Sequence, residues 1–442
     1  MSKLRDLYRK TGWHTVFSYD DEASTARTNL LYATIIQGVV NGFTTGVFYT
    51  GLLIGYGINI VNISIITLVP YVASLFSLFT PYILERFPVR RWILSIARVG
   101  YYTVNILGIT LLPILVKDPG ARVVGLVVIV FLAHSINFLF AGYSPWHMVY
   151  ITPEVRTGYF SATALVSNLS GSVFLIIASV VTDSLSPDAQ LKLIVALRFA
   201  AYAIAFLDIY FLQRPREPVY TVSTAKPSIL DIFRLPLSNK RFLLTILIYD
   251  IYSYIANMVA VVHITWLLQD VGTGYLYING INAVYSLAIL FTSPLWSRFM
   301  QKKGTFVSLA IGCFLLAPTH FAYAFVTGEN YMWLLTIIRL AQHGISMLLH
   351  FSASNLIYIN LPKADQTNYI SFHTVMANVA VFASLGTATW VVAAMGDSVW
   401  HLFGQPMSSV PTLLLVQFVL FMLLGIFVLL IRKKVEPEGI KI

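Results

Sequence analysis

Three ionisable side chains stand inside long apolar stretches of the chain, where they could carry chemistry. Asp250 lies in LIYDIYSYIAN (247–257), and Arg339 and His343 lie one helical turn apart in LLTIIRLAQHGIS (334–346). Charged groups are costly in a bilayer and usually face a bundle interior or a water-filled cavity. Asp250 and His343 are therefore a candidate carboxylate–imidazole pair for proton coupling, and Arg339 is a candidate anion-binding group. A structural ion pair or interhelical hydrogen bond is the alternative reading of each.

Further polar side chains lie on these and on four other apolar segments, many of them at helical spacing, which places them on shared helix faces. With Arg339 and His343, the candidate substrate-binding residues are Gln37, Asn41, His134, Asn137, Tyr254, Asn257, Asn279, Asn282, Ser346, His350 and His373. For the asparagines and serines, hydrogen bonding that holds helices together is an equal alternative. Structural roles are expected of four residues set away from these faces, with arginines reaching to the membrane surface: Arg98, Arg198, Asp208 and His320.

The composition requires the elements carrying these residues to be membrane spans. Hydrophobic residues make up 57% of the 442 residues and charged residues only 11%. Long apolar runs recur along the whole chain, and a run of about 18 or more such residues is typical of a transmembrane helix. The single cysteine, Cys313, excludes an internal disulfide and a multi-cysteine metal site.

Twelve spans are predicted, at roughly 28–54, 60–84, 92–115, 122–146, 157–182, 191–213, 241–268, 273–300, 304–327, 331–360, 365–394 and 410–432. Lys and Arg are concentrated in alternate connections, and only Lys117, Arg122 and Lys192 fall in the others. Cytoplasmic loops carry the excess of these residues, so both termini are expected in the cytoplasm. The net charge of +10 then reflects membrane orientation and gives no indication of a nucleic-acid partner.

The chain is predicted to consist of two similar halves. A cytoplasmic segment (1–27) precedes an N-terminal six-helix bundle (28–213), a linker (214–240), a C-terminal six-helix bundle (241–432) and a cytoplasmic tail (433–442). A weak repeat relates the halves, because YITPEVRTGYFSATALVSNL after span 4 is echoed by YINLPKADQTNYISFHTVMANV after span 10. Internal repeats of this kind are common in transporters.

The loop after span 2 reads PYILERFPVRR, and its echo after span 8 reads SRFMQKKG. With the two-half organisation, this loop resembles the signature of the major facilitator superfamily. The resemblance implies an all-α fold of two pseudo-symmetric six-helix bundles in which spans 1, 4, 7 and 10 line a central cavity. It also implies gating roles for Glu85, Arg86, Arg90, Arg91 and Arg298, whereas topology signalling alone is the plainer alternative.

The expected function is secondary active transport of a small polar organic solute, either anionic or a sugar, by alternating access with proton coupling. A lipid, amphiphile or drug exporter of the same fold is one alternative, and a transporter-like receptor without turnover is another. The sequence predicts no enzymatic activity, cofactor or metal, because it has no phosphate loop or nucleophile motif and few carboxylates near Arg339. We expect a monomer in the cell membrane, with the solute, a proton and the lipid bilayer as partners.

Overall fold

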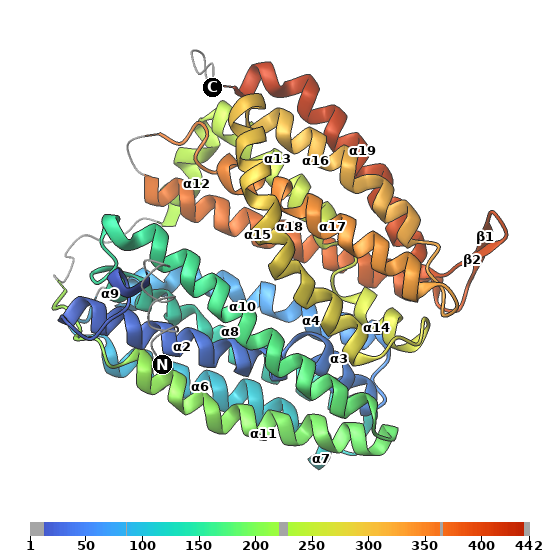
Figure 1. Cartoon of the computed structure of the whole chain (residues 1–442), viewed down its shortest axis with the longest axis horizontal. Helices are drawn as coiled ribbons and strands as arrows, with labels where there is room; N and C mark the ends of the chain where they lie inside the picture. Colours follow the sequence, from blue (N-terminus) through green and yellow to red (C-terminus); the bar gives the residue numbers. More distant parts are fainter. Residues whose placement is uncertain (1–12, 85, 221–228, 363–365, 437–442) are drawn as a thin grey trace, which may run out of the picture. The chain divides into compact units, whose positions relative to one another are not determined.

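The computed structural model describes residues 13–84, 86–220, 229–362 and 366–436, and these are almost entirely helical (Figure 1). The chain divides into two compact units. Unit 1 comprises Met1–Gly57 and Phe76–Pro227, and unit 2 comprises Ile58–Leu75 and Ser228–Ile442. Each unit is described by itself.

Unit 1 is built around one long interrupted helix. Its α-helices are α2 (Glu22–Thr44), α3 (Gly46–Gly55), α5 (Thr80–Leu84), α6 (Arg91–Tyr102), α7 (Ile109–Leu115), α8 (Pro119–Asn137), α9 (Tyr143–Met148), α10 (Pro153–Asp183) and α11 (Pro187–Leu212). Short 3₁₀ turns are η1 (Trp13–Thr15), η2 (Ser74–Phe79, which straddles the boundary between the units) and η4 (Phe138–Gly142), and η3 (Thr103–Gly108) is a π-helix. Helix α2 packs against both α10 and α11.

The ends of α2 show why it starts and stops where it does. Asp21 caps its first turn by accepting a hydrogen bond from the Ser24 backbone N–H at 2.8 Å, and the Ser24 side chain completes a capping box. At the other end Thr45 is extended and Gly46 has φ of +59°, a conformation that favours glycine. The chain therefore breaks between α2 and α3 and then resumes as a helix.

Arg198 of α11 stabilises this break. Its side chain is fully buried and donates hydrogen bonds to the Thr44 carbonyl at 3.0 Å, the Asn105 carbonyl at 3.1 Å and Thr110 Oγ1 at 2.7 Å. Thr44 ends α2, and Asn105 lies in the π-helix η3, so both carbonyls lie where a regular hydrogen-bond ladder is interrupted. The expectation that this arginine reaches to the membrane surface is therefore wrong.

Unit 2 is built from long α-helices and one short β-hairpin. Its elements are α4 (Ile60–Ala73), α12 (Ile229–Ser238), α13 (Lys240–Asn257), α14 (Val262–Gln269), α15 (Tyr275–Lys303), α16 (Thr305–Tyr323), α17 (Tyr331–Leu356), α18 (Gln366–Met395), β1 (Trp400–Leu402), β2 (Gln405–Met407) and α19 (Ser409–Val435). The core lies where α16 packs on α17 and α19, and Phe306, Cys313 and Phe421 are buried there. Helix α4 belongs to this unit because it packs on α18.

A β-hairpin joins α18 to α19, where the sequence analysis predicted only a connection (Figure 1). Strands β1 and β2 are antiparallel, with Trp400 opposite Met407. The two turn residues, Phe403 and Gly404, both have positive φ, as a tight hairpin turn requires. Strands of three residues are too short to show an alternating pattern in the sequence, which explains why the hairpin was missed.

Ten helical segments of the described residues are long and apolar enough to cross a membrane. Four of them are not continuous α-helices. Glu22–Gly55 contains the α2–α3 break, and Lys240–Gln269 is broken between α13 and α14. Arg91–Leu115 contains the π-helix η3, and Pro119–Met148 contains the 3₁₀ turn η4. The predicted spans 60–84 and 273–300 correspond to a shorter apolar helix, Ile60–Phe76, and to the 29-residue α15. The total of twelve spans and the orientation of the termini remain predictions.

Candidate functional site

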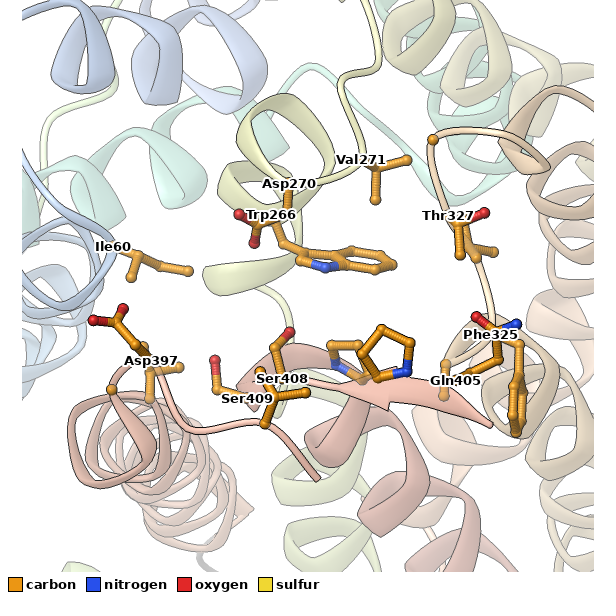
Figure 2. Close-up of a pocket in the computed structure, with 18 of the residues that line it drawn as sticks. Ile60, Trp266, Asp270, Val271, Phe325, Thr327, Asp397, Gln405, Ser408 and Ser409 are labelled. Atoms are coloured by element: carbon orange, nitrogen blue, oxygen red, sulfur yellow. The ribbon is translucent and has the colours of Figure 1, made fainter. Parts of the chain in front are cut away.

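Unit 2 contains a cavity of about 370 Å³ into which several of the predicted polar residues converge. Arg339, His343 and Ser346 of α17 line it, together with Asn282 of α15. Its other lining residues come from α13, α15, α16, α17 and α19: Tyr252, Ala256, Tyr285, Leu316, His320, Gln342, Leu349 and Phe421. A second, larger cavity of about 690 Å³ lies beside the β-hairpin (Figure 2) and is lined by none of the predicted site residues.

The Arg339 guanidinium is held in this cavity by neutral oxygen atoms. It donates hydrogen bonds to Asn282 Oδ1 and to Gln342 Oε1, both at 3.0 Å. Gln342 is fixed in turn by a 3.2 Å hydrogen bond from its Nε2 to Thr319 Oγ1. Among the described residues no carboxylate forms an ion pair with Arg339. The positive charge is therefore oriented but not neutralised, and the cavity is suited to an anionic group.

Two histidines border the same cavity in different settings. His343 is buried, and its Nε2 lies 3.0 Å from the Ile281 carbonyl, with which it forms a hydrogen bond. His320 stacks on Phe421 with ring centroids 5.3 Å apart, and its buried Nδ1 has no partner among the described residues. The structural role expected of His320 does not account for this position, because α16 corresponds to a span outside the set expected to line a cavity.

Asp250 does not meet His343. Asp250 lines another cavity, of about 390 Å³, whose other lining residues are apolar: Phe233 and Leu237 of α12, Leu243, Leu244, Ile246 and Leu247 of α13, and Phe372 and Met376 of α18. The expected carboxylate–imidazole pair is therefore wrong. The reason is the position of Asp250 around the helix axis. Tyr252 and Ala256 of α13 face the Arg339 cavity. Asp250 precedes Tyr252 by two residues, which is about 200° around the axis, so it points to nearly the opposite side of the helix.

The half-buried Asp250 carboxylate has an oxygen, Oδ1, without a hydrogen-bond partner in the described part of the chain. Two predicted residues of the same helix make local or interhelical bonds instead. Tyr254 donates to Thr387 Oγ1 at 2.9 Å, and Asn257 Nδ2 donates to the Ser253 carbonyl at 2.8 Å. These two fit the helix-packing alternative, whereas Asp250 has no such bond through Oδ1.

The remaining predicted binding residues are distributed over both units. Gln37 and Asn41 of α2 and His134 and Asn137 of α8 belong to unit 1. His134 Nδ1 lies 3.0 Å from the Val130 carbonyl in its own helix, and its ring meets Tyr101 edge-on.

In unit 2, three more of the predicted residues lie outside the lining of the Arg339 cavity. Asn279 is buried on α15, and His350 is exposed on α17. His373 of α18 is buried with its ring centroid 4.4 Å from that of Tyr249.

The predicted gating loop is bound to the segment that follows α11. The Glu217 carboxylate accepts hydrogen bonds from the backbone N–H groups of Arg90, at 2.5 Å, and of Arg91, at 3.0 Å. A carboxylate is favourable there because these amides form the first turn of α6. The Arg91 guanidinium donates to the Gln213 carbonyl, and that of Arg90 lies 4.0 Å from the centre of the Tyr220 ring.

The other members of the predicted gating set are not part of this contact. Arg86 and, on α15, Arg298 are exposed. Glu85 lies outside the described residues. Glu217 was not singled out from the sequence, and the only signal was its place in the charged run QRPREP (213–218).

We predict that Glu217→Gln lowers the midpoint of thermal unfolding in detergent, because it removes one acceptor and the charge from the start of α6. The expected cost is about 1 kcal/mol, as for loss of a helix cap. Differential scanning fluorimetry of the purified protein measures it. Glu329→Gln, in an exposed turn, is the control, and equal midpoints for the two variants would contradict the capping role.

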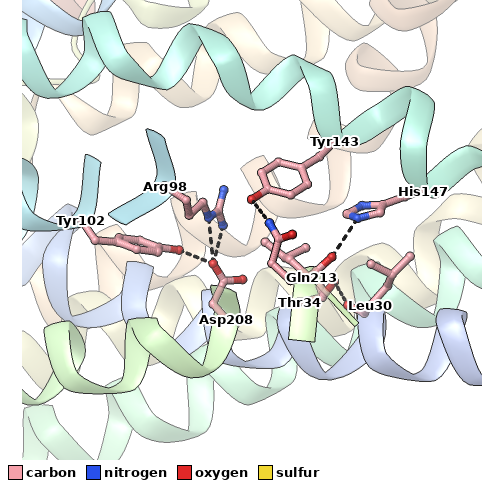
Figure 3. A network of polar contacts seen from close by, with 9 residues as sticks. Leu30, Thr34, Arg98, Tyr102, Tyr143, His147, Asp208 and Gln213 are labelled. Carbon is pink, nitrogen blue, oxygen red and sulfur yellow. Dashed lines mark hydrogen bonds and ion pairs between the residues drawn. The ribbon is translucent and has the colours of Figure 1, made fainter. Parts of the chain in front are cut away.

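Unit 1 contains a buried ion pair between Arg98 and Asp208, two residues of which a structural role was expected (Figure 3). Arg98 Nη2 lies 2.7 Å from Asp208 Oδ2, and the Tyr102 hydroxyl donates to the same oxygen at 2.6 Å. Only 7% of the Arg98 side chain and 1% of the Asp208 side chain are exposed. The expectation that Arg98 reaches to the membrane surface is therefore wrong. The figure also shows Gln213 donating to the Tyr143 hydroxyl, at 2.9 Å, next to this pair.

No family model matches the chain, and no curated protein matches it. Several solved structures are similar to it. The nucleoside transporter NupG is 12% identical with a TM-score of 0.65, covering 92% of this chain and 99% of its own. A bacterial homologue of the iron transporter ferroportin, in an inward-facing state, is 14% identical with a TM-score of 0.66, covering 91% and 98%.

A third similar structure is a POT family transporter in complex with 5-aminolevulinic acid. It is 13% identical with a TM-score of 0.62, covering 92% of this chain and 96% of its own. These structures share the fold of major facilitator superfamily transporters, and the chain has that fold. At these identities the likeness shows the fold alone.

Proposed function

We propose that the protein is a secondary transporter for a small polar organic solute with an anionic group. The observation that carries this is the Arg339 guanidinium, which faces a 370 Å³ cavity and, among the described residues, is held by the amide oxygens of Asn282 and Gln342 and by no carboxylate. Cavities of roughly 300–1,000 Å³ with a few oriented polar groups suit small ligands. The similar structures include nucleoside and peptide transporters, which supports a small solute as cargo.

Transport would proceed by alternating access in the cell membrane, with twelve spans, two six-helix bundles and both termini in the cytoplasm. In transporters built from repeats, the bundles rock around a site near the bilayer midplane. Within this proposal Gln37, Asn41, His134 and Asn137 are contributions of the N-terminal bundle to the solute path. The Glu217 contact with Arg90 and Arg91 is a cytoplasmic gate element.

Proton coupling is assigned to Asp250 alone in this proposal. A carboxylate among apolar side chains is costly to hold charged. Its surroundings are Phe233, Leu247, Phe372 and Met376, with no cation within this lining. Binding and releasing a proton as water access changes is the chemistry that such a group supports. His343 is retained as a solute-binding residue.

The apolar lining around Asp250 also favours a second candidate, transport of an amphiphile with a cationic head. In that case the 390 Å³ cavity would take the apolar part of the solute and Asp250 its charge. A receptor without turnover is the remaining alternative. Flux into proteoliposomes separates the receptor from both transporters, and the identity of the stabilising solute separates the two transporters.

The test is a thermal-stability screen of the purified protein against a solute library, because a ligand that binds the folded state raises its stability. We expect hits among organic anions, and Arg339→Gln should weaken their binding at least about tenfold, roughly 1.4 kcal/mol. Arg432→Gln, at the end of α19, is the matched control. Unchanged affinity in Arg339→Gln, or hits confined to neutral and cationic solutes, would contradict the anion site.

A further inference from the structure

The cavity beside the β-hairpin has a different chemistry from the Arg339 cavity (Figure 2). It has a volume of about 690 Å³. Trp266 and Asp270, from the end of α14, and Phe325, after α16, form part of its lining, and Asp397 and Gln405 come from the connection between α18 and α19. Aromatic surface and carboxylates thus face the same space.

The two carboxylates have no cationic partner in the part of the chain that the structure describes. Neither Asp270 nor Asp397 forms an ion pair or a side-chain hydrogen bond with another described residue. The connections at this end of unit 2 (270–274, 324–330 and 396–408) contain Asp270, Glu329 and Asp397 and no Lys or Arg. A recess lined by charges of one sign concentrates ions of the opposite sign. This end of the unit therefore attracts cations, although the whole chain carries a net charge of +10.

Each carboxylate also lies at the C-terminal end of a helix, where a negative charge is unfavourable. Asp270 is the C-cap of α14, and Asp397 follows the C-terminal end of α18 by two residues. The C-terminal end of a helix is its negative pole, where a cation is favourable and an anion is not. Partial burial in addition raises the pKa of Asp270. Helix stability therefore does not explain these two aspartates, whereas binding of a cation does.

Trp266 gives an independent indication of a ligand. Its side chain is only 3% exposed, and it lines the cavity. The indole N–H donates to no acceptor in the part of the chain that the structure describes. The indole nitrogen is not among the fully buried atoms that lack a partner, so it is accessible from the cavity although the side chain as a whole is buried. Tryptophan side chains held in this way usually bond an acceptor through the N–H. Figure 2 shows the ring lying across the cavity close to Asp270, so an acceptor on a bound molecule would complete this bond.

We propose that this cavity binds an organic cation that also carries a hydrogen-bond acceptor. Asp270 and Asp397 neutralise the ammonium group, Trp266 and Phe325 contact its apolar part, and the Trp266 N–H meets the acceptor. Aromatic faces beside carboxylates are suited to alkylammonium groups. Among the described residues no group of three His, Cys, Asp or Glu side chains is placed to hold a metal ion, so an organic cation fits better. The site is separate from the proposed solute site, because the two cavities share no lining residue.

Isothermal titration of the full-length protein with benzoylcholine tests this proposal. The probe combines a quaternary ammonium, an aromatic ring and an ester carbonyl, and benzoate provides the ring without the cation. We expect benzoylcholine to bind and benzoate not to compete with it. Asp270→Asn and Asp397→Asn should each weaken binding about tenfold. Trp266→Phe, which keeps an aromatic ring but removes the N–H, should weaken binding less.

Two matched variants locate the site. Glu329→Gln removes a negative charge from the same end of the unit without touching the lining, and it should bind as wild type does. Arg339→Gln should also bind normally, so failure of the solute-site proposal leaves this one intact. Wild-type affinity in both aspartate variants would overturn the proposal, as would loss of binding in Arg339→Gln or displacement by Ca²⁺ alone. If Asp270→Asn does not fold, the affinity of Asp397→Asn for benzoylcholine tests the proposal by itself.

Discussion

Replacing Asp208 with alanine is expected to lower the free energy of unfolding by about 3–5 kcal/mol, because it leaves a buried arginine without its counter-ion. Arg98 donates to Asp208 Oδ2 through Nε at 2.8 Å, and its Nη2 lies 2.7 Å from the same oxygen. Tyr102 would lose its acceptor as well. Arg98 also lies over the Phe140 ring, 4.6 Å from its centre, and this contact cannot replace a negative charge. Thermal and denaturant unfolding of detergent-solubilised protein measures the loss.

The double variant Arg98→Met/Asp208→Leu distinguishes a charge effect from a general packing effect. Removing both members of a buried ion pair is often close to neutral, whereas removing one is not. We therefore expect the double variant to be clearly more stable than Asp208→Leu alone, and together with Arg98→Met alone these variants should give a large coupling energy in a double-mutant cycle. A double variant as unstable as the single one would show that Arg98 and Asp208 stabilise unit 1 through packing alone.

The second large effect is expected from Asp250→Asn, which keeps the shape of the side chain but cannot bind and release a proton. In proteoliposomes, solute accumulation driven by a pH gradient should fall to the level reached without a gradient. Solute exchange between the two sides should persist, because exchange needs the binding site but no net proton movement. The solute is the one identified by the stability screen, and uptake of its labelled form is the measurement.

Asp188→Asn, at the exposed start of α11, is the control for this experiment and should accumulate solute as wild type does. Accumulation by Asp250→Asn that still follows the pH gradient would show that another group couples the proton. Loss of exchange together with accumulation would instead place Asp250 in solute binding, as the amphiphile alternative requires.

The face of α17 could be predicted from the sequence because its spacing is local. Arg339, His343 and Ser346 repeat at helical intervals within one uninterrupted helix, and all three line one cavity. The Asp250–His343 pair failed because it required the rotation of α13 relative to α17, which packing sets and periodicity does not. Tyr252 and Ala256, on the other side of α13, occupy the place expected for Asp250.

Buried charges were harder to place than the fold. The resemblance to the major facilitator superfamily predicted a fold that the similar structures share. It gave no indication that Arg98 pairs with Asp208, 110 residues away, because a single sequence does not reveal partners so distant. Likewise nothing local to Asp270 or Trp266 indicates a cavity, since most of its other walls come from distant parts of the sequence, such as Ile60 before them and Phe325 and Asp397 after them.

The bond between Arg198 and the end of α2 has a consequence for how the protein is made. The Thr44 carbonyl and the arginine that binds it are 154 residues apart. A backbone carbonyl released by a helix break needs a partner in hydrocarbon, where water is absent. While the ribosome is still synthesising α11, the first span therefore lacks the group that satisfies its break. We therefore expect that span to be less stable in the lipid until the sixth predicted span has been made, and a chain truncated before residue 198 to be less stable in the membrane than the full chain.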